Sequence, residues 1–384
     1  MNVLPDIAEG IDSLIAWRRE LHRHPELGLE VPETARVVAD RLRSFGVDQV
    51  IEGVGGHGVV GVIDQGEGPT VALRADMDAL PILETSGLPY ASEIPGRMHA
   101  CGHDGHTTML LGAARSLAQR RRFHGRAVLV FQSGEETLEG APAMLDDGML
   151  DRFGIQVIYG MHNLPGGEVG TMRVPDGAAL ASSNRFTILV RGTGGHAGLP
   201  QLCRNPIDVA AAIVVQLHQQ FQRDASPGIA LAITNVGAGA GVYNIIPDEA
   251  RLEGSLRSLD PGVAQSVTAE MEKVVSAVAA DQGVTADLVI EPLCPVTRNH
   301  PVQAAYARDV AGRLMGVAAV TEGEPLMASE DFAFFLEQRP GAFAFIANGN
   351  TAPLHNSSYD FNDEILGLGA SYWVRLVEEG GGIQ

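Results

Sequence analysis

A strand, a helix and a second strand can be read directly from PTVALRAD (residues 69–76), HDGHTTMLLGAARSLAQR (103–120) and RAVLVFQS (126–133). Both strands are apolar and rich in β-branched residues, which is typical of strands buried on both faces. GHGVVGVID (56–64) and GIQVIYGMH (154–162) have the same character on either side of this run. Alternation of buried strands with helices predicts an α/β layered domain.

Helices are expected at both ends of the chain. An apolar stripe at helical spacing predicts one helix from Asp6 to about His24, and a second helix begins near Pro32 and ends at Gly46. In the C-terminal part we expect helices at 301–315, 331–336 and about 362–379, and a buried strand at 341–347.

The pattern changes after about residue 178. Strands are expected at 184–191, 229–236, 249–259 and 286–291, with helices at 206–221 and 261–282. This β-α-β-β-α-β order is that of a ferredoxin-like unit. We therefore expect one discontinuous domain of residues 1–178 and 296–384, interrupted by a smaller domain of residues 179–295.

Composition excludes several classes of protein. The formal net charge of −20 over 384 residues argues against binding to nucleic acid, which needs a surface rich in Lys and Arg. No run approaches the roughly 18 apolar residues of a membrane span, and the N-terminus lacks the features of a signal peptide. Three widely spaced cysteines do not suggest a disulfide framework, so we expect a cytoplasmic protein.

The densest chemical signal is HACGHDGH at residues 99–106. Cys101 and His103 lie in a glycine-rich turn just before a predicted helix. Thiolate and imidazole are preferred ligands of zinc and similar divalent ions. The alternative is a buried cysteine with polar histidines that cap the helix.

A second signal, SGEE, directly follows the strand that ends near residue 132. Adjacent carboxylates at the end of a buried strand are costly unless each has a function. One of Glu135 and Glu136 could bind metal while the other serves as a general base. The alternative is a solvated acidic loop that extends to Glu139.

Weaker signals follow other strands. His162 ends one strand, and His355 lies in the loop after another. Asp76 and Asp78 also leave a strand, where they could orient ligating histidines or simply stabilise a turn. Each of these is ambiguous alone, but sites in open α/β sheets lie outside the carboxyl ends of the strands. The combination predicts a metal site with an unligated glutamate beside it.

These segments together closely resemble the aminoacylase and carboxypeptidase G superfamily of two-metal peptidases. The nearest branch is that of hippurate hydrolases, bacterial N-acyl-amino-acid amidohydrolases and plant auxin-conjugate hydrolases. The resemblance covers nearly the whole chain and is carried by RRELHRHPELGLEVPETA, ALRADMDALPILE, MHACGHDGHTTMLLGAA, FQSGEETLEGAPAML, GMHNLPGGEVG, GTGGHAG, NIIPDEARLEGSLRS, SEDFAFF and LHNSSYDFND. It implies a zinc-peptidase-like α/β catalytic domain, with the inserted ferredoxin-like domain as a lid and dimerisation domain.

The resemblance also implies roles for matching residues. Cys101 matches a bridging metal ligand that is an aspartate in other branches. The other ligands implied are His103, Glu136, His162 and His355. Glu135 matches the general base that takes a proton from the water between two divalent ions, which are zinc, manganese, nickel or cobalt, and passes it to the leaving amine.

In the inserted domain, His196 resembles a histidine that stabilises the oxyanion, in some relatives from a partner subunit. Asn244 and Arg257 resemble residues that hold the substrate carboxylate. One departure concerns a His-x-Asp motif of other branches, which is Asp76-Met-Asp78 here. His103 is therefore expected to supply the missing imidazole, and Asp76 is not counted as a ligand.

The sequence thus predicts a homodimeric or larger amidohydrolase that cleaves N-acyl amino acids. Two alternatives are a dipeptidase or exopeptidase of the same fold and a non-catalytic metal-dependent binding protein, against which an unligated Glu135 argues. The remaining histidines and two cysteines are interpreted as structural or surface residues: His22, His24, His57, His99, His106, His124, His218, His300, Cys203 and Cys294.

Overall fold

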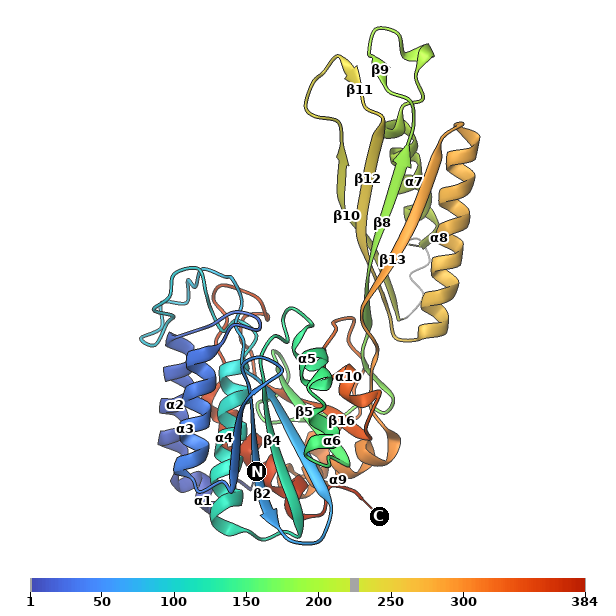
Figure 1. Ribbon diagram of the computed structural model, residues 1–384. Coiled ribbons are helices and arrows are strands. Elements are labelled where there is room, and N and C mark those ends of the chain that lie inside the picture. Colours follow the sequence, from blue (N-terminus) through green and yellow to red (C-terminus); the bar gives the residue numbers. More distant parts are fainter. Residues whose placement is uncertain (1, 222–227, 384) are drawn as a thin grey trace. The chain divides into compact units, whose positions relative to one another are not determined.

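The computed structural model describes residues 2–221 and 228–383 and divides into two compact units (Figure 1). Unit 1 consists of residues 1–179, 297–324 and 330–384, and unit 2 of residues 180–296 and 325–329. The sequence placed the insertion at 179–295 and did not anticipate the short segment 325–329. Within the described residues, no helix combines the length and apolar character that a membrane span requires.

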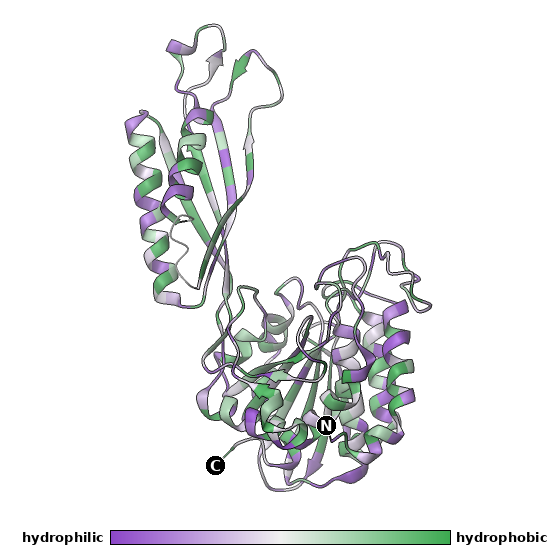
Figure 2. Cartoon of the chain, turned by 180° about the vertical axis from the view of Figure 1, so that it is seen from behind, coloured by the Kyte–Doolittle hydropathy of each residue, from purple (hydrophilic) through white to green (hydrophobic). Residues whose placement is uncertain are grey.

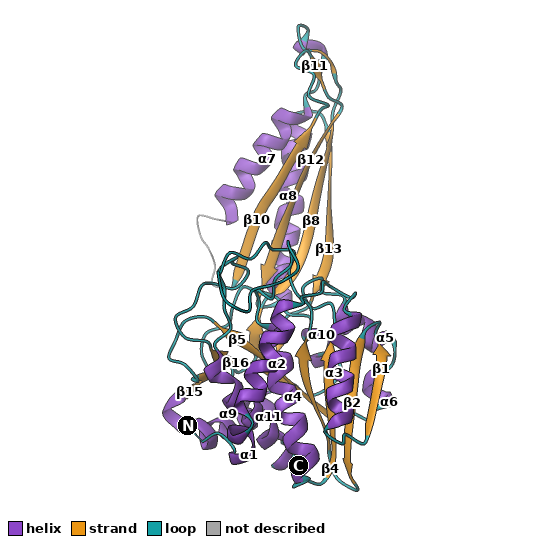
Figure 3. Ribbon diagram, turned by 90° about the vertical axis from the view of Figure 1, so that its left-hand side faces the viewer, coloured by secondary structure: helices purple, strands orange, loops and turns teal. Residues whose placement is uncertain are grey.

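Unit 1 is built on an eight-stranded sheet, which confirms the predicted α/β class with a large central sheet (Figure 3). In sheet order its strands are β1 (Gln49–Val54), β2 (Gly58–Gln65), β4 (Gly125–Gln132), β3 (Thr70–Asp76), β5 (Val157–Leu164), β16 (Gly341–Ala347), β6 (Met172–Arg173) and β15 (Val320–Thr321). β4, β3, β5 and β16 run parallel to one another, so their carboxyl ends share one edge of the sheet.

Helices cover both faces of this sheet (Figures 1 and 3). One face carries α1 (Pro5–Glu9), α2 (Ile11–Arg23), α3 (Pro32–Ser44), α4 (His103–Arg120), α9 (Pro301–Met315) and α11 (Leu366–Glu378). The other carries α5 (Gly140–Asp146), α6 (Met149–Arg152) and α10 (Ala333–Leu336). Short 3₁₀ turns at Val317–Ala319 and Asp363–Ile365 precede β15 and α11.

The prediction of one helix from Asp6 to His24 was wrong. The helix is interrupted at Gly10, which separates α1 from α2. A side chain at this position would overlap the guanidinium group of Arg115 on α4. The apolar stripe continues across the break because both helices pack on the same core, so periodicity alone could not reveal the interruption.

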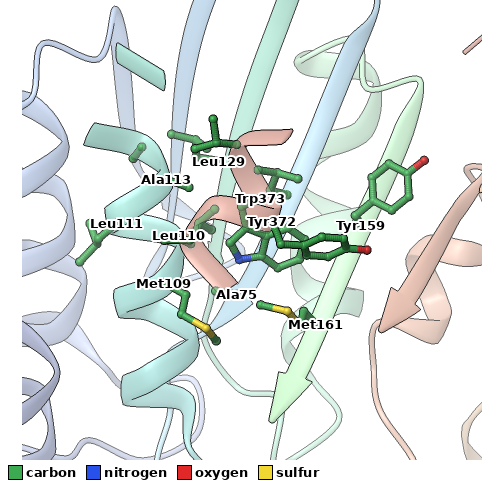
Figure 4. Packing of buried hydrophobic residues seen from close by; sticks show 14 of the residues in the cluster. Ala75, Met109, Leu110, Leu111, Ala113, Leu129, Tyr159, Met161, Tyr372 and Trp373 are labelled. Atoms are coloured by element: carbon green, nitrogen blue, oxygen red, sulfur yellow. The ribbon is translucent and has the colours of Figure 1, made fainter. Parts of the chain in front are cut away.

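The main core of unit 1 lies between the sheet and α4 and α11 (Figure 4). Trp373 and Tyr372 of α11 are almost fully buried there. They lie in one cluster with residues of α4 and of the central strands, among them Met109, Leu110, Ala113, Ala75, Leu129, Tyr159 and Met161. This packing anchors the strand ends and the first turn of α4.

Close packing at the first turn of α4 makes a testable prediction. A methyl group at Gly105 would overlap the buried ring of Phe361, whereas at the helical Gly312 it would make an ordinary contact with Val317. Gly105→Ala should therefore destabilise the protein by about 1–3 kcal/mol through overpacking. Gly312→Ala should stabilise it by about 0.4–1 kcal/mol, because alanine lowers the conformational entropy of the unfolded chain. Denaturant unfolding of both variants measures the two changes in the free energy of unfolding, which should have opposite signs. Changes of the same sign would contradict the prediction.

Unit 2 has strands and helices in the order β8 (Ser182–Arg191), α7 (Pro206–Phe221), β10 (Ile229–Ala238), β12 (Glu249–Ser258), α8 (Pro261–Asp281) and β13 (Thr285–Cys294). Its antiparallel sheet has the order β10-β12-β8-β13, and α7 and α8 pack on one face of it (Figure 3). Apolar and polar residues alternate along α8 (Figure 2), because its apolar stripe, including Met271 and Val275, faces the sheet.

Smaller elements complete the description. A pair of two-residue strands, β9 (Gly195–His196) and β11 (Ile245–Ile246), lies in unit 2 together with a 3₁₀ turn at Pro200–Leu202. β7 (Ala178–Leu180) and β14 (Thr297–Arg298) form another two-stranded sheet.

Candidate metal centre

Four candidate ligands converge around the sulfur of Cys101 in unit 1. The Cys101 Sγ atom lies 3.4 Å from Nε2 of His162 and 3.3 Å from Nε2 of His355. Nε2 of His355 in turn lies 3.5 Å from Oε1 of Glu136. The parallel strands explain this convergence, since His162 lies on β5 and the other residues lie in the loops after β3, β4 and β16, at the carboxyl edge of the sheet.

The loop that carries His355 is held in an unusual conformation. The φ angle of His355 is +62°, a region that non-glycine residues seldom adopt. Its backbone N–H donates to the carbonyl oxygen of Ala100, one residue before Cys101. Backbone strain of this kind is characteristic of functional sites, where the surrounding structure fixes it.

The imidazole rings of His103 and His162 are oriented by backbone carbonyls. Nδ1 of His103 is 2.8 Å from the carbonyl oxygen of Asp78, and Nδ1 of His162 is 2.5 Å from that of Asn163. A carbonyl can only accept, so each Nδ1 carries a proton, and Nε2 is the nitrogen of each ring whose lone pair could bind a metal ion. In metal sites of proteins, a hydrogen bond from Nδ1 of this kind fixes the orientation of a histidine ring that binds the metal ion through Nε2.

Among the described residues, five groups of three side chains could hold an ion, and two of these groups share one atom. Cys101, His103 and His162 form one group, and Cys101, Glu136 and His355 form the other; the ligand atoms within each lie within 4.8 Å of one another. The sulfur of Cys101 belongs to both groups. This arrangement brings together all five residues that the sequence nominated as ligands.

Unpartnered polar atoms indicate that the donor set fits a cation. Among the residues that the structure describes, neither Nε2 of His103 nor Oε1 of Glu136 has a hydrogen-bond partner, although both atoms are buried. Buried polar atoms in proteins are normally satisfied. Sulfur, imidazole nitrogen and carboxylate oxygen are together a suitable set for zinc and related divalent ions.

The two aspartates after β3 have different contacts. The carboxylate of Asp78 accepts hydrogen bonds from the backbone N–H groups of Glu135 and Glu136, each at 3.1 Å. The carboxylate of Asp76 instead contacts Nδ1 of His106 at 2.6 Å and Nη1 of Arg74 at 2.7 Å. Asp78 thus fixes the backbone of Glu135 and Glu136, whereas Asp76 contacts His106, for which the sequence predicted only a structural or surface role.

Glu135 lies in an acidic cluster. Its carboxylate oxygens come within 4.8 Å of those of Glu330 and Asp331, and it is 6% exposed. Burial and the neighbouring carboxylates, Glu330 first, raise the pKa of Glu135 well above its ordinary value. The buried Arg74 guanidinium pairs with both Glu330 and Asp331. One arginine does not neutralise these carboxylates, so the site favours added positive charge.

The sequence interpretation missed several residues of this site. His106 lies three residues after His103 on α4, a spacing that places both on one side of the helix. Arg74 lies two residues before Asp76 on β3 and therefore on the same face of the sheet. These two spacings could have identified His106 and Arg74 from the sequence. Glu330 and Asp331 lie in SEDFAFF, a segment that carried the family resemblance, but no role was predicted for them.

The remaining candidates lie in unit 2. His196 lies on β9 and Asn244 directly precedes β11; both are exposed, and the N–H of Ala197 donates to the carbonyl oxygen of Asn244. Nδ1 of His196 accepts from the N–H of Gly198, which leaves Nε2 to carry the proton of the neutral ring. Arg257 lies elsewhere, on β12, and donates to Oγ of Ser329 within the same unit.

A buried ionic network lies beside the first turn of α4. Nδ1 of His22 contacts the carboxylate of Asp104 at 2.8 Å, and Nε2 contacts Glu84 at 3.4 Å. Arg18 is 3.6 Å from the same Asp104 carboxylate. Burial alone would lower the pKa of His22, but the hydrogen bonds to Asp104 and Glu84 raise it to about 9.

This pKa predicts a pH-dependent contribution of His22 to stability. The folded-state value lies above the ordinary value of 6.5. The contribution is therefore fully present below about pH 6.5 and disappears as the pH rises through 9, with a limit of about 3 kcal/mol. Unfolding of metal-free wild type and His22→Gln at pH 6 and pH 9.5 checks this. A stability difference that is the same at both pH values would contradict it.

Comparison with known proteins gives concordant matches. A model of peptidase family M20/M25/M40 matches residues 72–379. The chain is 40% identical to hippurate hydrolase of Campylobacter jejuni over 380 residues, 98% of each chain. It is 36% identical to N-acetylcysteine deacetylase of Bacillus subtilis, covering 94% of this chain and 95% of that one. The YXEP protein of Bacillus subtilis, a dinuclear metal binding peptidase, superimposes with a TM-score of 0.86 at 33% identity over 98% of this chain and 100% of that one.

Proposed function

Because the chain belongs to peptidase family M20/M25/M40, we propose that it is a metal-dependent amidohydrolase that splits N-acyl amino acids into a carboxylic acid and a free amino acid. The family resemblance expected from the sequence is confirmed. Two relatives that match over nearly their whole length are named hippurate hydrolase and N-acetylcysteine deacetylase. Hippurate and N-acetylcysteine are both N-acyl amino acids.

The observation that carries this proposal is a sulfur atom shared by two ligand groups, with Glu135, which belongs to neither of these two groups, beside them. Cys101, His103 and His162 would hold one ion. Cys101, Glu136 and His355 would hold the other. When bound, two such ions lower the pKa of the attacking water and polarise the scissile carbonyl group.

Glu135 acts as the general base in this proposal. Its carboxylate takes a proton from the attacking water and delivers it to the leaving amine nitrogen. The hydrogen bond from its N–H group to Asp78 fixes its backbone. Burial and neighbouring carboxylates raise the pKa of Glu135, and cations bound beside it would favour the ionised form that a general base requires.

We also propose roles for three residues of unit 2. We assign to His196 the stabilisation of the oxygen that gains charge, from its own subunit or the partner's, since its Nε2 is available as a donor. We assign binding of the substrate carboxylate to Asn244 and Arg257. Guanidinium and amide groups are suitable donors for a carboxylate.

The proposal also includes the identity of the metal ions, the oligomeric state and the cell compartment. The ions are zinc, manganese, nickel or cobalt, because the thiolate and imidazoles accept each of them. The edge strands β10 and β13 of unit 2 favour a homodimer or larger homo-oligomer. The buried thiols of Cys101 and Cys203 are suited to a reducing cytoplasm.

The deciding experiment measures hydrolysis of a panel of N-acyl amino acids and unblocked dipeptides. Metal-stripped protein is refilled with zinc, manganese, cobalt or nickel before the assay. Metal-dependent turnover of blocked substrates is the expected result, and it identifies the preferred acyl group. Turnover restricted to unblocked dipeptides would replace the proposal with an exopeptidase. Metal uptake without any turnover would favour a binding protein.

A further inference from the structure

Asn163 connects three separate parts of the candidate metal centre. Its side-chain Nδ2 lies 2.7 Å from the carbonyl oxygen of Cys101 and 3.0 Å from Nε2 of His106. Its backbone N–H donates to the same His106 nitrogen at 2.9 Å. Its backbone carbonyl accepts from Nδ1 of His162. Asn163 is fully buried, so these contacts are shielded from water.

The donor and acceptor roles in this network follow from its chemistry. A backbone N–H can only donate, so Nε2 of His106 must be an acceptor. The proton of that ring is then on Nδ1, where it is donated to the carboxylate of Asp76. The carbonyl of Cys101 can only accept, which orients the Asn163 amide with Nδ2 toward it. No other assignment satisfies these contacts.

Tyr359 completes the network from the loop that also carries His355. Its hydroxyl donates to Oδ1 of Asn163 at 2.5 Å, and burial raises the pKa of Tyr359 well above its ordinary value, so the proton is retained. Gly102, next to Cys101, has a φ angle of +95°, and any side chain there would overlap Asn163 and Tyr359. The turn at Cys101 is thus shaped to admit Asn163.

We propose that Asn163 is a positioning residue that holds the Cys101 turn and the His162 ring in the geometry that both metal groups require. It would not itself touch metal or substrate. Asn163 would affect both ligand groups through Cys101, which belongs to both, and one group through His162. This inference rests on the proposed function, because it assumes that the two groups hold ions.

The test compares Asn163→Ala with Asn299→Ala. Asn299 is a matched control, since it is buried in unit 1 and makes three similar hydrogen bonds with Pro175 and Phe343 away from the site. Zinc affinity is measured by chelator competition, and the cobalt-loaded proteins are examined for the thiolate-to-cobalt absorption band. Removal of residues that orient metal ligands typically weakens affinity by about 10–100-fold.

We expect Asn163→Ala to lose about 10–100-fold in zinc affinity and to shift the cobalt band, while Asn299→Ala loses only thermal stability. Tyr359→Phe keeps the shape of the side chain and should show the same shift with a smaller loss, which covers the case in which Asn163→Ala does not fold. Equal zinc affinity and an unchanged band in the Asn163 and Tyr359 variants would overturn the inference. Wild-type protein that binds two ions yet hydrolyses nothing would contradict the proposed function alone.

Discussion

Replacement of Glu135 by Gln is expected to lower kcat by about 10²–10⁴-fold while two metal ions remain bound. The amide has nearly the shape of the carboxylate but cannot accept the proton of the attacking water. The hydrogen bond from the backbone N–H of residue 135 to Asp78 does not depend on the side chain, so the glutamate pair should keep its position. Steady-state kinetics and metal analysis of the same preparation check both parts.

Glu139→Gln provides the matched control for this experiment. Glu139 belongs to the same acidic segment but is exposed, and the same chemical change there should leave kcat within about twofold, as expected for a surface substitution. Full activity of Glu135→Gln with both ions present would refute its role as general base. Loss of metal in that variant would instead mean that Glu135 is a ligand.

The parts of the site that the sequence predicted are those that follow strands. The apolar strands β3, β4 and β5 were recognisable, and parallel strands place the residues after them at a common edge. Cys101 and His103 were recognisable because residues two apart in a glycine-rich turn can face one point. The convergence of four other candidate ligands on the sulfur of Cys101 therefore follows from topology together with local composition.

Long-range polar pairing could not be predicted in this way. The hydroxyl of Tyr359 meets Asn163 across 196 residues, and the guanidinium of Arg74 meets Asp331 across 257. Neither pairing has a periodic signature, since it depends on how distant segments pack. The buried carboxyl groups of Glu330 and Asp331 both pair with Arg74, and the local pattern of a single chain does not reveal such compensation.

Unit 2 shows the same division between local and long-range information. Alternating strands and amphipathic helices indicated its elements, and Pro206 and Pro261 mark the first residues of α7 and α8. The sequence did not indicate that residues 325–329 join this unit, where Leu326 bridges to Leu180. The side chain of Arg257 is held by this added segment, through Ser329.

Replacement of Cys101 should have the largest effect on metal binding, because its sulfur is common to both ligand groups. Residues that only orient a ligand contribute about 10–100-fold to metal affinity, so loss of a shared ligand should exceed 100-fold. We expect Cys101→Ala to bind zinc at least about 100-fold more weakly at both positions and to lose hydrolysis in proportion. Calorimetric or chelator-competition titration gives the affinities and the number of ions bound.

Two further variants decide what the sulfur contributes. Cys203→Ala removes a buried thiol of unit 2 and should leave both affinities unchanged. Cys101→Asp restores an anionic ligand without sulfur, and because carboxylates favour harder ions than thiolates do, it should regain two manganese ions more readily than two zinc ions. If Cys101→Ala lost only one of two ions, the sulfur would belong to a single site. If it lost neither, the lone pairs of His103, His162 and His355 would have to hold the ions without a bridge, and the shared-sulfur geometry would have no role in binding.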